Sequence, residues 1–290
     1  MSISSNYPSI RPSLLLDFAR SKALDPRITF TRSTTATYYD GETEAKAEEN
    51  LLTYSQDATQ WSKTNSIVTG NTQTAPDGTT TADTYEVLSD FSGLSRVVST
   101  TAPYTTSIFV KYVDTQYFRI RTSGPNTATW FDIQNGTIAT NQHDSASITD
   151  VGNGWYRISV TENTTDMTGV QYYLHDTDGS LTEVAGTTYI WGAQLEQRSS
   201  VTAYTPTTTQ PVTNYIPVLL TANAGAPRFD HDPLTGLCKG LLIEEQRTNL
   251  LTYSQSIGTN WSVNTQIKNL GAVVAPDGSL TATYFMQTST

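Results

Sequence analysis

The sequence predicts an all-β protein whose main module is a jelly-roll β-sandwich. Short runs with alternating apolar residues follow one another at regular spacing, and turn residues separate them. Thr, Ser, Asn, Gly and Tyr replace charged residues, which make up only 15% of the chain, against the usual ~25%. No segment longer than about two turns has the apolar period of a helix. These observations favour a β-rich surface or fibre protein over a metabolic enzyme.

Turn signals and apolar alternation define the strands of the sandwich. In Pro76-Asp77-Gly78, Pro fixes φ, Asp bonds its own backbone and Gly supplies a positive φ. Asn135-Gly136 is the strongest hairpin signal, and Gly152–Gly154 separates two further strands. The expected strand regions are Thr105–Val113, Gln116–Thr122, Thr127–Thr140 as a hairpin, Ala146–Thr161 as two strands, Gly169–Asp176 and Thr187–Gln197.

A repeat divides the chain. The stretch "NLLTYSQ" occurs at Asn50–Gln56 and again at Asn249–Gln255, and an "APDG" turn follows each copy, at Ala75–Gly78 and Ala275–Gly278. Identical turn chemistry at an almost constant offset indicates two homologous modules. We expect "NLLTYSQ" to be the entry strand of each sandwich. Since only the start of a second sandwich fits before Thr290, we expect the parent protein to be longer.

The repeat and the composition predict that the chain is divided into four structural parts. A short helix is expected around Leu14–Ala23 and a Thr-rich strand after it, while Glu42–Asn50 and Thr205–Tyr215 are interpreted as linkers. The ranges are 1–48, the N-terminal part of a split attachment or linker unit; 49–205, the sandwich; 206–248, a linker and the C-terminal part of the split unit; and 249–290, the start of a second, incomplete sandwich.

Charge and hydropathy exclude several classes of partner. The chain has 17 basic and 27 acidic residues, a formal charge of −10, which argues against nucleic acid and against anionic membrane surfaces. No run approaches the ~18 apolar residues of a membrane span, and the N-terminus does not have the pattern of a signal peptide. The single cysteine, Cys238, has no internal disulfide partner.

The sequence contains no motif for catalysis, a cofactor or a metal. It has no GxSxG, Walker or HExxH motif, so we predict that the protein is not an enzyme and needs no cofactor. The three histidines lack zinc-like spacing. His175–Ser180 and Phe229–Pro233 are acidic stretches that we interpret as turns with local Asx bonding rather than as metal sites.

One candidate binding site comes from strand alternation. If the strands containing "YFRIR" and "TWFDI" pair, one face carries apolar residues and the other a polar and aromatic patch. An aromatic ring can stack on a sugar, and Arg and Asp can bond its hydroxyls. The alternatives are a subunit contact or plain solvated surface. The patch residues are Tyr117, Arg119, Arg121, Trp130 and Asp132, whereas Trp61, Trp155 and Trp191 are interpreted as core residues.

Three segments resemble parts of bacteriophage tail-fibre and other virion appendage proteins. They are "FTRSTTATYYDG" (30–41), "PRFDHDPLTG" (227–236) and "GLLIEEQRTNLLTYS" (240–254). In those families the segments follow one another closely, so the resemblance implies that the module at 49–205 was inserted into an older unit. The module itself resembles a phage carbohydrate-binding-like sandwich through "APDGTTTA", "SIFVKY", "FDIQNGT", "VGNGWYRISV" and "YIWGAQLEQRSSVTAYTPT".

The resemblance implies a structural role in a virion. The expected function is a tail-fibre segment that builds the appendage and contacts host surface polysaccharide. The expected partners are further copies of the chain, as a homotrimer, and other virion proteins. Such a protein is made in the host bacterial cytoplasm and released by lysis. The alternatives are a capsid (head) fibre or decoration protein without a receptor role, and the non-catalytic part of a polysaccharide depolymerase.

Overall fold

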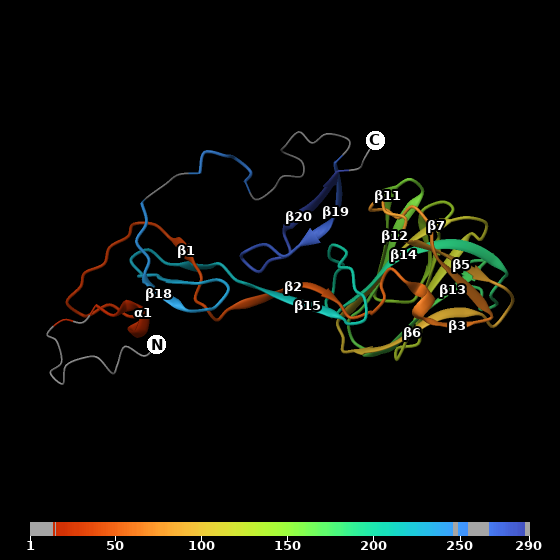
Figure 1. The fold of residues 1–290 in the computed structure, drawn as a ribbon, viewed down its shortest axis with the longest axis horizontal. Coiled ribbons are helices and arrows are strands. Elements are labelled where there is room, and N and C mark those ends of the chain that lie inside the picture. The colour runs from red at the N-terminus through yellow and green to blue at the C-terminus, as the bar shows by residue number, and fades with distance from the viewer. Residues whose placement is uncertain (1–13, 15, 246–248, 255–266, 288–290) are drawn as a thin grey trace. The chain divides into compact units, whose positions relative to one another are not determined.

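The computed structural model describes residues 14, 16–245, 249–254 and 267–287. The fold is all-β, as predicted (Figure 1). The α-helix expected around Leu14–Ala23 is reduced to the single turn α1 (Phe18–Ser21), and the carboxylate of Asp17 accepts a hydrogen bond from the Arg20 N–H at its start, at 3.3 Å. Among the described residues, no helix is long and apolar enough to cross a membrane.

The described residues form two compact units. One contains those within Met1–Ala45, Tyr215–Ser254 and Val274–Ser279, and the other those within Lys46–Asn214, Gln255–Val273 and Leu280–Thr290. The first unit therefore combines segments from both sides of the sandwich sequence. The described residues of the predicted range 249–290 are divided between the two units, and the four ranges stay a prediction.

The sandwich consists of two six-stranded sheets, named here after their strands β8 and β7. The β8 sheet has the order β10-β9-β8-β13-β6-β3, and its strands are β3 (Ser62–Thr64), β6 (Gly93–Thr100), β8 (Tyr117–Ser123), β9 (Thr127–Asp132), β10 (Thr137–Asn141) and β13 (Met167–His175). The β7 sheet has the order β11-β12-β7-β14-β5-β4, and its strands are β4 (Ser66–Gln73), β5 (Ala82–Val87), β7 (Tyr104–Tyr112), β11 (Ser145–Gly152), β12 (Trp155–Glu162) and β14 (Gly186–Glu196).

The pairing of these strands gives a jelly roll. Antiparallel pairs form between β8 and β9, β7 and β12, β6 and β13, and β5 and β14. Each pair brackets the previous one along the chain, as in a long hairpin that is rolled up so that successive pairs alternate between the two sheets. The prediction of a jelly-roll sandwich is confirmed.

The turns explain why the strands end where they do. β9 and β10 form the predicted hairpin, in which Gly136 has a φ of 69° and its N–H donates to the Asp132 carbonyl at 2.8 Å. β11 and β12 flank Asn153 and Gly154, whose φ values of 55° and 77° are those of the two-residue turn that suits the twist of a hairpin.

Two apolar clusters hold the module together. The main core lies between the sheets and includes Leu52, Tyr85, Ile108, Phe118 and Tyr172. A smaller aromatic cluster packs on the outward side of the β7 sheet and contains Ala75, Ala82, Phe109, Trp155 and Trp191. Trp61, Trp155 and Trp191 are 3%, 1% and 6% exposed, so the prediction that these three rings are core residues is confirmed.

The prediction that "NLLTYSQ" is an entry strand is wrong. The strand β2 (Glu44–Asn50) ends at the first residue of the motif, and residues 51–57 form turns and bends before the 3-10 turn η2 (Ala58–Gln60). Tyr54 has a φ of 56°, which a strand does not permit. The motif is a tight turn rather than an extended segment.

The Asn50 side chain makes four buried hydrogen bonds in this turn. Its amide NH2 donates to the carbonyls of Ala193 and Thr205 at 3.0 and 2.9 Å, and its Oδ1 accepts from the N–H groups of Leu52 and Leu195, each at 3.1 Å. β14 has a register irregularity between 191 and 194, and such an irregularity leaves backbone groups unpaired. Asn50 supplies partners to two of the backbone groups around it.

The same turn joins the two ends of the module. The N–H groups of Tyr54 and Ser55 donate to the carbonyls of Thr208 and Thr207 at 2.6 and 3.3 Å. Residues near 50 and near 205 are therefore neighbours in space. Ends that lie together at the surface are the arrangement in which an inserted domain is tolerated.

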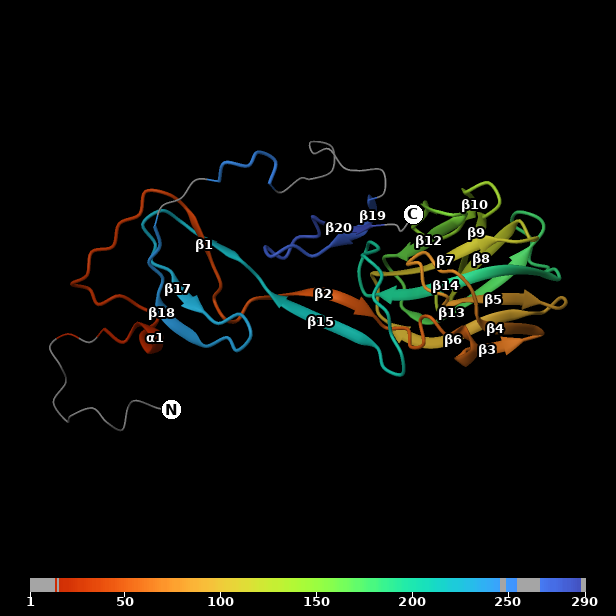
Figure 2. The same cartoon turned by 45° about the horizontal axis from the view of Figure 1, so that its top comes forward.

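Strands occupy most of the first segment interpreted as a linker and the end of the second. β2 pairs with β15 (Val212–Pro217) in a two-stranded ribbon (Figure 2), and the Asn214 side chain donates to Glu48 at 2.9 Å. Glu48 is exposed, whereas Glu49 is only 2% exposed and binds Lys46 at 2.8 Å. The linker interpretation missed this ribbon because its two strands are distant in sequence.

The compact unit outside the sandwich contains two small sheets. β1 (Ala36–Tyr38) pairs with β16 (Leu220–Ala222), and β17 (Phe229–His231) pairs with β18 (Cys238–Leu241). The predicted Thr-rich strand corresponds to β1.

The second "NLLTYSQ" begins like the first. Tyr253 has a φ of 55°, and Asn249 Oδ1 accepts from the Leu251 N–H at 2.9 Å. The strands β19 (Ile267–Val273) and β20 (Ala282–Gln287) form a hairpin whose pair Val273–Ala282 matches Gln73–Ala82 of the first copy. Both "APDG" turns have the same backbone hydrogen bonds.

Candidate functional site

The five residues of the predicted patch lie on the outward face of the β8 sheet. β8 and β9 pair as predicted, while Phe118 and Ile120 point into the core and are completely buried. Tyr117 is half-buried. The opposed residues are Tyr117 and Asp132, Arg119 and Trp130, and Arg121 and Ala128.

The ring of Trp130 is covered. It is 1% exposed, and its Nε1–H donates to the carbonyl of Ser180, in the loop that follows β13, at 3.0 Å. The guanidinium of Arg119 packs on the ring, 4.8 Å from its centroid, and Arg119 is itself only 7% exposed. Trp130 therefore offers no face on which a sugar could stack, and glycan binding by the five residues stays a prediction.

The polar groups of the patch are used within the protein. Asp132 accepts hydrogen bonds from the side chains of Gln116 and Asn135, each at 2.8 Å. Burial raises the pKa of Asp132, but the hydrogen bonds from Asn135 and Gln116 outweigh it and leave the pKa below its usual value. Arg121 donates to the side chain of Gln171.

A groove of about 340 Å³ lies beside this patch, over β6 and β13. Residues of β3, β6 and β13 line it, together with residues of the loop before β6 and the loop after β13. Its volume is at the lower end of the ~300–1,000 Å³ of small-molecule sites. The lining residues are Thr64, Phe91, Ser92, Gly93, Leu94, Ser95, Gln171, Tyr173, Leu181 and Glu183.

Tyr173 forms the aromatic floor of this groove. A Cβ on Gly93 would lie 2.8 Å from Cε1 of Tyr173, so the ring rests directly on the glycine backbone. Its other neighbour is Arg119, whose guanidinium is 4.9 Å from the ring centroid. Because Arg119 also packs on Trp130, the patch forms a Trp–Arg–Tyr stack that fixes Tyr173.

Two exposed apolar residues flank the groove. Phe91 is 85% exposed and Leu181 is 71% exposed. Phe91 has a φ of 54°, which is unfavourable for a bulky residue, and its N–H donates to the Glu183 carboxylate at 3.2 Å. Glu183 is 8% exposed and lies 3.9 Å from Arg119. The buried carboxylate thus holds the loop that presents Phe91.

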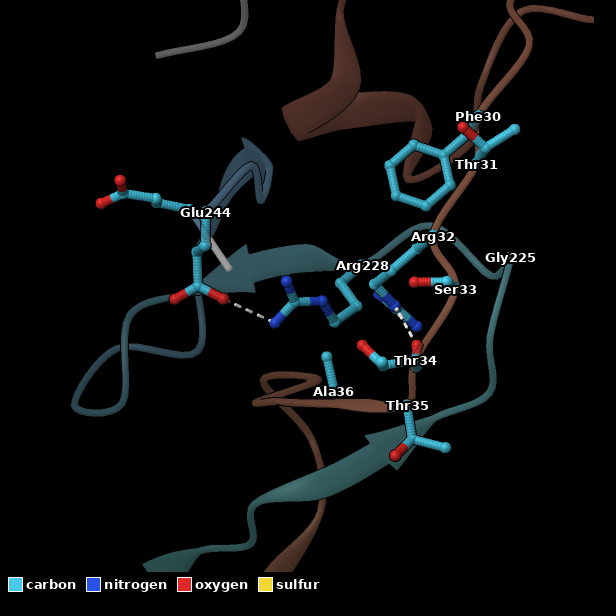
Figure 3. Close-up of a pocket in the computed structure, with 11 residues that line it drawn as sticks. Phe30, Thr31, Arg32, Ser33, Thr34, Thr35, Ala36, Gly225, Arg228 and Glu244 are labelled. Carbon is cyan, nitrogen blue, oxygen red and sulfur yellow. Dashed lines mark hydrogen bonds and ion pairs between the residues drawn. The ribbon is translucent and has the colours of Figure 1, made fainter. Parts of the chain in front are cut away.

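A larger hollow, about 930 Å³, lies in the other compact unit (Figure 3). The three segments that resemble appendage proteins all contribute to it, through Phe30–Ala36, Arg228 and Glu244–Glu245. Its lining is rich in hydroxyl groups from the 30–36 segment. The hollow is therefore polar, and it brings together residues about 200 positions apart in the chain.

Arg228 ties these segments together, and Arg32 ties the first of them to residue 223. Arg228 is 6% exposed and donates to the Thr37 carbonyl at 2.7 Å. It also donates to Glu244 at 2.8 Å (Figure 3). Arg32 donates to the carbonyls of Thr34 at 2.8 Å and Asn223 at 2.5 Å. Nη1 of Arg32 and Nε of Arg228 are buried without a hydrogen-bond partner among the described residues.

The acidic stretches are turns or strand ends. Residues 176–179 form the bend and turn that the sequence predicted. Asp232 accepts from the N–H groups of Leu234 and Thr235 at 3.0 and 3.1 Å, which is the predicted Asx bonding, although Phe229–His231 is a strand rather than part of a turn. Within the part of the chain that the structure describes, no cluster of three His, Cys, Asp or Glu residues could hold a metal ion.

No protein-family model matches the chain, and no curated protein is detectably similar to it.

Sequence reasoning found the supporting layer of the groove but missed the groove. Alternation identified Arg119 and Trp130, which hold Tyr173 from one side. It did not identify Phe91, Tyr173 or Glu183, because their proximity depends on the non-local pairing of β6 with β13. The usable signal was "DFSG" (90–93), where an aromatic residue stands next to turn-forming residues.

Proposed function

We propose that the chain is a non-catalytic structural component of a bacteriophage virion, a segment of a tail fibre whose sandwich contacts host surface glycans. In this proposal the unit built from both sides of the sandwich sequence joins the chain to its neighbours. The sandwich is the outward-facing module.

The observation that carries the proposal is the assembly of the three appendage-like segments in one place. Residues 30–41, 227–236 and 240–245 share one compact unit, and Arg228 bonds directly to residues from the other two segments. A sequence resemblance spread over three distant segments would carry little weight if they lay apart. Their convergence supports the interpretation that they belong to one functional unit.

The hollow in that unit suits a contact with a neighbouring chain. Hydroxyl groups of the 30–36 segment and the carboxylates of Glu244 and Glu245 line the hollow. Such groups can form hydrogen bonds with polar groups of another copy or of another virion protein. A homotrimer fits this role, and light scattering of the purified chain tests it.

Immunogold labelling of purified phage particles tests the function. An antibody raised against residues 49–205 should label the tail, and mass spectrometry of washed particles should detect the chain. Label on the head would favour the capsid-fibre or decoration alternative. Absence of the chain from washed particles would refute a structural role.

A further inference from the structure

The groove over β6 and β13 combines an aromatic floor, apolar walls and polar groups. We propose that it binds one pyranose ring of a neutral glycan, with Tyr173 and Phe91 contacting the C–H face of the sugar and Glu183 and Gln171 bonding its hydroxyls. The inference rests on the proposed glycan-contacting role and assigns it a site and a ligand class.

The floor is held rigidly before any ligand arrives. Tyr173 lies on the backbone of Gly93 and against Arg119, which in turn lies on Trp130. A ring fixed in this way loses little freedom on binding. The buried stack therefore explains why the predicted patch has aromatic and cationic residues without an open surface: it supports the neighbouring site.

Phe91 is presented to solvent at a conformational cost. Its φ of 54° is unfavourable, and the protein uses a buried carboxylate, Glu183, to hold the backbone there. Its ring is 85% exposed and contributes nothing to the core. Leu181 also lines the groove, so two exposed apolar side chains accompany the ring of Tyr173 and a few polar groups, a typical composition for a small-ligand site.

The charge of the lining favours a neutral ligand. The lining residues include one carboxylate, Glu183, and no Lys or Arg. Arg119 lies behind Tyr173 and 3.9 Å from Glu183, so its charge is directed at that carboxylate. An acidic sugar would bring a second negative charge to the groove, whose lining includes no cation to pair with it. The side-chain oxygen of Gln171 accepts from Arg121, which leaves its amide NH2 as a donor.

Saturation-transfer NMR with the whole chain tests the proposal. The probes are the methyl glycosides of glucose, galactose, mannose and N-acetylglucosamine, with the methyl glycoside of glucuronic acid as a charged match for glucose. Phe91→Ala and Tyr173→Ala remove the two rings. Val97→Ala is the matched control, because Val97 is on β6, is also 85% exposed and does not line the groove. Thermal unfolding of Phe91→Ala and Val97→Ala should equal that of the wild type.

The proposal predicts that at least one neutral glycoside binds and that each ring deletion weakens it about tenfold or more. Val97→Ala should bind like the wild type, and the glucuronide should bind more weakly than the glucoside. Binding of no neutral glycoside would overturn the proposal, as would equal binding by Phe91→Ala or tighter binding of the glucuronide.

This result is separate from the virion test. A chain found on particles that binds no neutral glycoside would refute the groove and leave the structural role. A chain that binds a neutral glycoside but is absent from particles would refute the structural role and leave the glycan site. Light scattering of Phe91→Ala and of the wild type shows whether the exposed ring instead joins two copies. If it does, the variant loses the oligomer that the wild type forms, and the sugar site is refuted.

Discussion

Replacement of Asn50 by alanine should destabilise the sandwich more than the replacement of an ordinary exposed turn residue would. The side chain is completely buried and bonds two carbonyl oxygens and two N–H groups. Each buried group left without a partner costs about 1–3 kcal/mol, so the low estimate for four groups is about 4 kcal/mol. A water molecule in the space left by the amide can restore part of this. We therefore expect a loss of about 3 kcal/mol.

Asn249→Ala is the matched control. Asn249 begins the second copy of the same motif but is exposed, and its Oδ1 bonds the local N–H of Leu251. We expect this substitution to change stability by no more than about 0.5 kcal/mol. The contrast between two identical motifs isolates the contribution of the long-range bonds.

Tryptophan fluorescence during urea and thermal unfolding is the assay, since four of the five tryptophans lie in the sandwich: Trp61, Trp130, Trp155 and Trp191. For a domain of this size, 3 kcal/mol corresponds to a fall of about 10 °C in Tm. An Asn50→Ala chain that unfolds within 1 °C of the Asn249→Ala chain would refute the reasoning.

Three further predictions concern other parts of the chain. Burial lowers the pKa of His143 to about 4, so the unfolded chain takes up this proton at a higher pH than the folded chain. The free energy of unfolding should therefore fall as the pH drops from about 6.5 to 4, by up to about 1.4 kcal/mol per pH unit. Chemical unfolding across this range should show a smaller dependence of that free energy on pH for His143→Gln. Arg228→Ala should destabilise its unit by about 2 kcal/mol, with faster amide exchange in residues 30–41, whereas the exposed Arg27→Ala should leave exchange there unchanged. Gly93→Ala should displace the ring of Tyr173 and weaken glycoside binding while the sandwich stays folded, and unchanged binding would show that the ring position is not needed.

Local sequence signals predicted most of the sandwich. Asn135-Gly136 and Asn153-Gly154 define hairpins because the necessary backbone angles are set by residues within the turn. Alternation in "YFRIR" identified the inward residues Phe118 and Ile120. These features depend on neighbours in the sequence, so the sequence alone is enough to predict them.

The errors have a common physical cause. The role of Asn50 depends on carbonyls more than 140 positions away, and the ribbon of β2 and β15 joins segments separated by the whole module. Likewise, Trp130 is buried because the loop at Ser180 covers it, which alternation along β9 cannot show. Burial by a distant loop is a tertiary property that periodicity does not encode.

The closure of the module at Asn50 and the pairing of β2 with β15 mean that the chain enters and leaves the sandwich at the same place. A domain whose two ends lie together tolerates insertion or exchange. Another sandwich with adjacent ends could replace it without altering either strand of the ribbon. If the groove binds a glycan as proposed, variation in the loops that carry Phe91 and Leu181 changes the ligand and leaves the bonds of Arg32 and Arg228 in the other unit unaltered.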